Sequence, residues 1–163
     1  MKHKFKLVLG DWSGDGHREY VNRVIECNHD VKTMQEAYKA SCKKFGFSFN
    51  HNDDFTGIER DYMEAKKYQV CSEYEDNKVS EEVLQILDAN NCPWRDLIDE
   101  KPPEDISEGA TIYLDGFVKL LMWFISQSLD EKLEWKESSD EIPVLNGYWD
   151  ENLNIQFAYG LFS

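Results

Sequence analysis

Apolar side chains are densest between Ile112 and Leu129, and their spacing there is helical. Steps of three and four along the chain place them on one face of an α-helix. The sequence therefore predicts a buried helix over this stretch, around which the rest of the chain packs. The apolar residues at this spacing are Tyr113, Phe117, Leu120, Leu121, Phe124, Ile125 and Leu129.

A membrane-spanning segment is the alternative for this stretch, because about 20 apolar residues are enough to cross a bilayer. Asp115 and Lys119 lie inside it. Each charge costs about 2.5–3.5 kcal/mol at the centre of a bilayer, whereas both face solvent if the segment is a core helix. We therefore expect a buried helix and no membrane contact.

Two amphipathic helices are predicted in the first third of the chain. Apolar residues recur at helical spacing from His17 to Cys27 and again from Val31 to Phe45. Asp30 is placed to cap the start of the second helix, and Gly46 is placed to end it. A polar turn separates the two stretches, so we expect an antiparallel helical hairpin.

Alternating apolar residues predict strands near both ends of the chain and in its middle, at Phe5–Leu9, Lys67–Glu75 and Leu153–Leu161. A short helix is expected after Ser80, whose hydroxyl group can cap it. The pattern as a whole predicts a single α+β domain over residues 1–163. In it, the helical hairpin and the buried central helix pack on one face of an antiparallel or mixed sheet.

The cysteines and the N-terminus indicate where the protein resides. The apolar centre of the N-terminal stretch, Leu7–Leu9, is shorter than the roughly 7–15 residues of a signal peptide, so we expect a cytoplasmic protein. Its cysteines form no C-x-x-C pair and adjoin no histidine cluster, which predicts reduced, mostly buried thiols and no zinc site. The cysteines are Cys27, Cys42, Cys71 and Cys92.

The net charge of -14 is unevenly distributed along the chain. Residues 1–50 hold nine Lys and Arg against six Asp and Glu, and residues 51–163 hold nine against twenty-six, so the balances are +3 and -17. The acids concentrate in Asp96–Glu108 and Asp130–Glu141. Direct binding to nucleic acid or to an anionic membrane is disfavoured, because both need basic side chains facing phosphate. A basic protein partner is favoured.

The leading hypothesis is an acidic binding protein that inhibits or neutralises a basic protein partner, as an immunity protein, a nuclease inhibitor or a nucleic-acid mimic does. Carboxylates would steer the encounter, and a tryptophan would supply a desolvated contact. The alternative for the acids is a surface that keeps the protein in solution, and for Trp94 it is packing under its own loop. No cofactor is expected. The residues assigned to the partner are Trp94, Asp99, Glu100, Glu104, Asp105, Glu108 and Trp135.

The turn after the first strand, Gly10–His17, offers a second hypothesis. Asp11, Ser13 and Asp15 occupy alternate positions, and a helix is expected to begin near His17. The N-terminus of a helix attracts anions, because its free amides point outward. Asp11, Asp15 and His17 are therefore candidates for a metal or phosphate site in an enzyme, and a capped strand-to-helix turn is the alternative.

Three known patterns resemble this turn, each over about a dozen residues or fewer. The tetrapeptide S-G-D-G after L-V-L resembles the glycine loop of Rossmann-type methyltransferases, which bind S-adenosylmethionine, although Trp12 stands where the first Gly of that loop belongs. The D-x-S-x-D-G spacing resembles the first half of an EF-hand calcium loop, with Asn22 in place of the bidentate Glu. An aspartyl-nucleophile phosphatase has a second Asp where Ser13 stands. Each match is partial, so no family is assigned.

Overall fold

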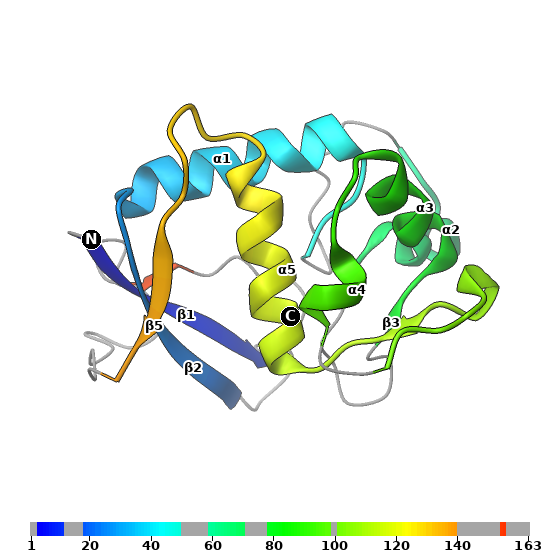
Figure 1. Ribbon diagram of the computed structural model, residues 1–163, viewed down its shortest axis with the longest axis horizontal. Helices are drawn as coiled ribbons and strands as arrows, with labels where there is room; N and C mark the ends of the chain where they lie inside the picture. Colours follow the sequence, from blue (N-terminus) through cyan, green and yellow to red (C-terminus); the bar gives the residue numbers. More distant parts are fainter. Residues whose placement is uncertain are drawn as a thin grey trace.

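The computed structural model describes residues 3–11, 18–49, 59–70, 78–98, 101–139 and 154–155. Its class is α+β, as predicted. Figure 1 shows a sheet at one end, α5 through the middle and a group of short helices at the other end. In chain order the elements are β1 (His3–Asp11), β2 (Arg18–Cys27), α1 (Val31–Phe45), α2 (Tyr62–Ala65), η1 (Lys66–Tyr68), β3 (Lys78–Val79), α3 (Glu81–Ala89), α4 (Trp94–Leu97), η2 (Ile106–Glu108), β4 (Ala110–Thr111), α5 (Leu114–Ser126), β5 (Trp135–Ser138) and β6 (Asn154–Ile155).

The main sheet is mixed, with strand order β5-β2-β1-β6. β1 and β2 form an antiparallel hairpin in which Phe5 pairs with Ile25, and both side chains are fully buried. β5 adds antiparallel to β2, whereas β6 runs parallel to β1. A separate two-stranded sheet joins β3 to β4, with Val79 opposite Ala110.

The predicted helix at His17–Cys27 is wrong, because Arg18–Cys27 forms β2. Val24 and Ile25 are β-branched and fit a strand better than a helix. The decisive factor is pairing with β1 from Arg18 to Cys27, with one register shift between Leu9 and Gly10, because this pairing satisfies backbone groups of both strands. The predicted helical hairpin is therefore a β-hairpin followed by one helix, α1.

Both predicted ends of α1 are confirmed. The Asp30 carboxylate accepts a hydrogen bond from the Thr33 backbone N–H at 2.7 Å, and the hydrogen bonds from Thr33 lower the pKa of Asp30. Gly46 ends the helix with a φ of 78°, and its N–H donates to the Cys42 carbonyl. This left-handed conformation favours glycine.

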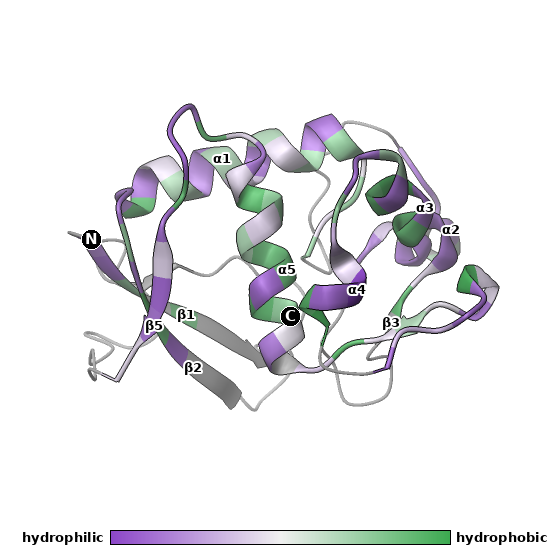
Figure 2. Cartoon of the chain, viewed as in Figure 1, coloured by the Kyte–Doolittle hydropathy of each residue, from purple (hydrophilic) through white to green (hydrophobic). Residues whose placement is uncertain are grey.

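The buried central helix is confirmed as α5. Its apolar face is fully enclosed, whereas Asp115 and Lys119 are exposed. The Phe124 ring lies 4.9–5.8 Å from four aromatic rings of α1 and of the segment after it, those of Tyr38, Phe45, Phe47 and Phe49. Figure 2 shows hydrophobic residues through most of α5. Of the helices that the structure describes, none is long and apolar enough to cross a membrane.

Two other predicted strands are described only in part. The stretch predicted as a strand from Lys67 to Glu75 begins in η1, continues through a single parallel bridge from Gln69 to Ser48, and lies outside the described residues from 71 to 77. Of the predicted C-terminal strand, the structure describes only β6. Three of the cysteines, Cys27, Cys42 and Cys92, are buried free thiols; Cys71 lies outside the described residues.

Candidate functional site

Trp94 lies in the core and not at the surface. Its side chain is fully buried, and its Nε1 donates a hydrogen bond to Asp88 Oδ1 at 2.8 Å. Arg95 stacks over the Trp94 ring at 4.2 Å and also donates to Asp88. Hydrogen bonds from Arg95 and then from Trp94 lower the pKa of Asp88, against the opposing effect of its slight burial. The Trp94 side chain is therefore enclosed, as in the alternative of packing under its own loop, and it leaves no exposed ring for the predicted partner contact.

Trp135 is only partly buried. It belongs to β5, where it pairs with Cys27, and its ring packs against the hydrophobic core. Part of the acidic stretch Asp130–Glu141 is therefore a sheet strand. Its remaining exposure leaves the predicted partner contact untested.

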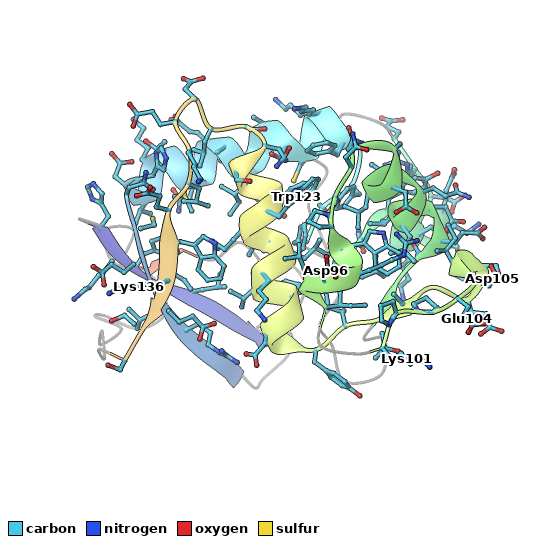
Figure 3. The ribbon with its side chains drawn as sticks, in the orientation of Figure 1. Asp96, Lys101, Glu104, Asp105, Trp123 and Lys136 are labelled. Carbon is cyan, nitrogen blue, oxygen red and sulfur yellow. The ribbon has the colours of Figure 1, made fainter. Side chains whose placement is uncertain are left out.

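The acidic segment around η2 faces solvent. Glu104, Asp105 and Glu108 are all exposed, and no described cation lies within ion-pair distance of them. The Asp105 carboxylate accepts a hydrogen bond from the Ser107 N–H at 2.9 Å, which lowers the pKa of Asp105. Figure 3 shows Glu104 and Asp105 at the opposite end of the molecule from Lys136. Asp99 and Glu100 lie outside the described residues.

Gly109 fixes where this acidic segment returns to the fold. Its φ is +75°, and a Cβ atom at this position would lie 2.7 Å from the Val79 carbonyl oxygen. Only glycine avoids that clash in this conformation. The close approach lets β4 pair with β3 directly after η2, so the exposed carboxylates are attached to a paired strand.

The turn at Gly10–His17 joins two antiparallel strands, because Asp11 ends β1 and pairs with Arg18 of β2. A strand, β2, therefore begins where a helix N-terminus was expected near His17. The attraction of an anion to the free amides of a helix N-terminus does not apply to a strand. The side chain of Asp11, and all of Asp15 and His17, lie outside what the structure describes. Within the described ranges, no group of three His, Cys, Asp or Glu side chains is placed to hold a metal ion. The metal or phosphate site stays a prediction.

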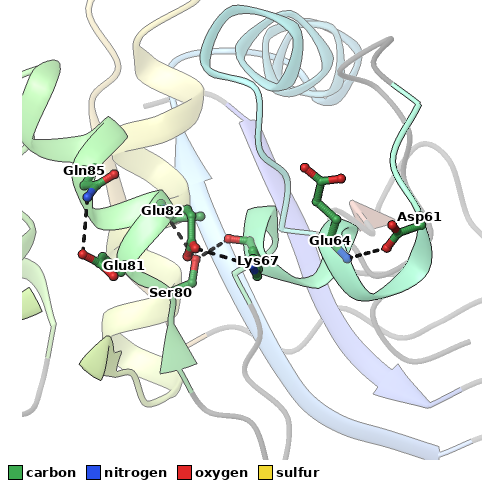
Figure 4. Close-up of polar contacts among 8 residues, drawn as sticks. Asp61, Glu64, Lys67, Ser80, Glu81, Glu82 and Gln85 are labelled. Carbon is green, nitrogen blue, oxygen red and sulfur yellow. Dashed lines mark hydrogen bonds and ion pairs between the residues drawn. The ribbon is translucent and has the colours of Figure 1, made fainter. Parts of the chain in front are cut away.

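A surface groove that the sequence pattern did not reveal lies between the α2–η1 segment and α3. Its volume is about 370 Å³. Met63 lines it with 72% of its surface exposed, which is unusual for a large apolar side chain. Figure 4 shows the polar side chains that line the groove and those beside it. The lining residues are Asp61, Met63, Glu64, Lys67, Tyr68 and Glu82.

One hydrogen bond joins the two walls of the groove, and others cap the helix in each wall. The Ser80 hydroxyl donates to the Lys67 carbonyl and accepts from the Val83 N–H, so the cap of α3 is also tied to η1. On the other wall, Asp61 Oδ1 accepts from the Glu64 N–H at 2.9 Å and so caps α2. Ser80 was visible in the sequence as a helix cap, but its link to Lys67 was not.

Comparison of this chain with protein-family models, curated proteins and solved structures finds no match. Fold class alone implies no function. The function is therefore argued from the charges and surfaces described above.

Proposed function

We propose that this chain is an acidic binding protein that inhibits or neutralises a basic protein partner. The observation that supports this most directly is that no described acidic side chain is buried; the buried polar residues of the described ranges are Ser41 and Ser48. The described acidic side chains are therefore at least partly exposed and accessible to a partner. Surface potential of one sign steers an oppositely charged protein and accelerates its encounter.

The acidic segment 104–108 is the part of this surface best suited to a partner. Elsewhere, the described ion pairs already engage several acids with lysine or arginine: Glu26, Glu82, Asp88, Asp115 and Glu137. The carboxylates of segment 104–108 have no such described neighbour. A basic partner gains attraction there without breaking an ion pair within the chain.

Inhibition would follow from occupation of the partner's basic surface. A protein that binds phosphate or acidic substrates presents lysine and arginine side chains, and an acidic domain placed over them excludes the usual ligand. The predicted signature is an association rate that falls steeply with ionic strength, because salt screens exposed charges.

The test begins with recovery of a partner from host lysate on the immobilised protein, with elution by a salt gradient. The recovered protein is then purified, and its association rate and activity are measured with the wild-type chain. The variant Glu104→Gln/Asp105→Asn/Glu108→Gln removes three charges but keeps an acceptor at position 105 for Ser107. We expect association to slow roughly tenfold at low salt and inhibition to weaken.

The matched control is Glu36→Gln/Asp130→Asn/Glu131→Gln, which changes the net charge equally at three other exposed positions. A smaller effect of this control supports the assignment to segment 104–108. Binding that is independent of salt and unchanged by both variants contradicts the proposed function, and so does failure to retain any basic protein.

A further inference from the structure

We propose that the groove between the α2–η1 segment and α3 is a docking site for an arginine side chain of the basic partner. This inference rests on the proposed function and adds the place and chemistry of one contact. Four features of the groove support it: an exposed apolar wall, an excess of carboxylates, a guanidinium already stacked on one of its residues, and its position beside the acidic segment.

Met63 provides the apolar wall. Of the large hydrophobic residues that the structure describes, only Met63 and Tyr113 are strongly exposed, at 72% and 47%. A flexible thioether adapts to the shape of an incoming side chain. The methylene stem of arginine packs along such apolar surface while its charged end stays near polar groups. An exposed Met63 at the edge of a groove suits that arrangement.

The charge of the groove favours a cation. Asp61, Glu64 and Glu82 face a single lysine, Lys67. Lys67 Nζ lies 4.0 Å from the Glu82 carboxylate, at the limit of an ion pair, and its side chain is 59% exposed. No described cation lies within ion-pair distance of Asp61 or Glu64. Two carboxylates therefore remain for a partner's guanidinium, which can bind a carboxylate through two parallel hydrogen bonds.

The chain itself already places a guanidinium on a groove residue. Arg60 Cζ lies 3.9 Å from the centroid of the Tyr68 ring, within the range of a cation–π contact. Arg60 also donates to the Gly46 carbonyl, so it is held by the body of the protein. The planar guanidinium stacks on aromatic rings more readily than an ammonium does. Because Arg60 occupies this face of Tyr68, the incoming side chain meets Met63 and the carboxylates. We assign arginine and not lysine because its planar fork can bind a carboxylate through two parallel hydrogen bonds.

The groove lies at the same end of the molecule as the acidic segment 104–108. α3 contacts both η1 and η2, and Figure 1 shows α2 and α3 grouped away from the main sheet. A partner attracted by the carboxylates of segment 104–108 therefore approaches close to the groove. The volume of about 370 Å³ lies near the lower end of the roughly 300–1,000 Å³ of small-molecule pockets, which suits one inserted side chain.

The experiment follows the Met63 methyl group by NMR in the full chain labelled at methionine methyl carbons, with Met63→Leu used to assign the signal. The probe is a hexa-arginine peptide. We expect it to shift the Met63 signal in a saturable way. Asp61→Asn/Glu64→Gln/Glu82→Gln should weaken binding roughly tenfold. Lys67→Gln should strengthen binding severalfold, because it removes the competing cation. The amide oxygen introduced at position 61 can still accept from the backbone N–H of residue 64, which keeps the cap of α2.

Two controls separate docking in the groove from general attraction. Glu36→Gln/Asp130→Asn/Glu131→Gln changes the net charge as the groove triple variant does, and hexa-lysine carries the same charge as hexa-arginine. The inference predicts a weaker effect of that variant and a smaller Met63 shift with hexa-lysine. An unmoved Met63 signal, or equal effects of the two triple variants, overturns it. If the purified partner still binds with strong salt dependence in that case, the proposed function survives and only the groove assignment fails.

Discussion

Acidic residues at the sheet end and in segment 104–108 at the helical end differ in the ion pairs that they make. At the sheet end, Arg23 of β2 lies 2.6 Å from Asp115 and 3.0 Å from Glu137, so one guanidinium joins β2 to α5 and β5. At the helical end, the carboxylates of segment 104–108 have no described cation nearby. The comparison indicates that Asp115 and Glu137 link elements at the sheet end through Arg23, whereas the carboxylates of segment 104–108 at the helical end make no described ion pair.

The two ends nevertheless share α5. Its face toward α1 carries Phe124, and α4 packs against the same helix. The buried residues form one continuous cluster that includes Phe5 of the sheet and Trp94 of the helical end. The two regions that differ in their surface ion pairs therefore share one hydrophobic core.

The substitution Phe124→Ala is expected to have the largest effect on stability, because it removes a side chain from the core that both ends share. Loss of a buried phenylalanine costs about 3–5 kcal/mol, and we expect the free energy of unfolding to fall by that amount in one cooperative transition. Denaturant unfolding followed by circular dichroism and by hydrogen exchange measures this. If only one end loses protection from exchange, the two ends are independent, and the shared core does not couple them.

A smaller effect is expected from Arg23→Ala at the sheet end. Partial burial acts to lower the pKa of Arg23, but the carboxylates of Asp115 and Glu137 together outweigh it and raise that pKa above its ordinary value. Loss of such a partly exposed ion pair costs about 1 kcal/mol or less, and the cost should shrink at high salt. Urea unfolding at low and high salt measures it.

The comparison variant for Arg23→Ala is Glu104→Gln at the helical end, which should leave stability within about 0.5 kcal/mol of wild type. If Glu104→Gln lowers the free energy of unfolding as much as Arg23→Ala does, Glu104 makes a structural contact. The contrast between the two ends would then fail.

The smallest effect is a pH dependence from Asp88, an acid of the helical end that does have a structural role. Arg95 and Trp94 lower its pKa in the folded state. Its stabilising effect is therefore complete above the unfolded pKa, near 3.8, and is lost as pH falls through the lower folded value. Because the Asp88 side chain is 37% exposed, we expect less than about 1 kcal/mol.

The measurement for Asp88 is the free energy of unfolding across the acidic range for wild type and Asp88→Asn. The variant should flatten the acid-side slope, while Asp130→Asn, at an exposed position on the loop after α5, should leave the slope unchanged. If the free energy of unfolding changes with pH by the same slope in all three proteins, Asp88 does not contribute to the loss of stability at acidic pH.

Local features of this protein were predictable from its sequence. Asp30 and Ser80 cap helices because their side chains reach backbone amides three residues away, and Gly46 ends α1 because its own backbone allows a positive φ. The burial of α5 was also predictable, since so dense an apolar face is stable only inside the protein. The exposure of Glu104 and Glu108 followed from their charge alone.

Features that depend on distant partners were decided only by the tertiary structure. β2 has apolar spacing compatible with a helix, and it is a strand because β1 pairs with it. A tryptophan near acidic residues is typical of a surface contact with a partner. In the folded protein, however, the core encloses Trp94, and Asp88 accepts a hydrogen bond from its indole N–H. The groove draws residues 61–68 and Glu82 together from segments separated along the chain. Short-range patterns cannot encode such contacts, because the interaction energy comes from residues that become neighbours only on folding.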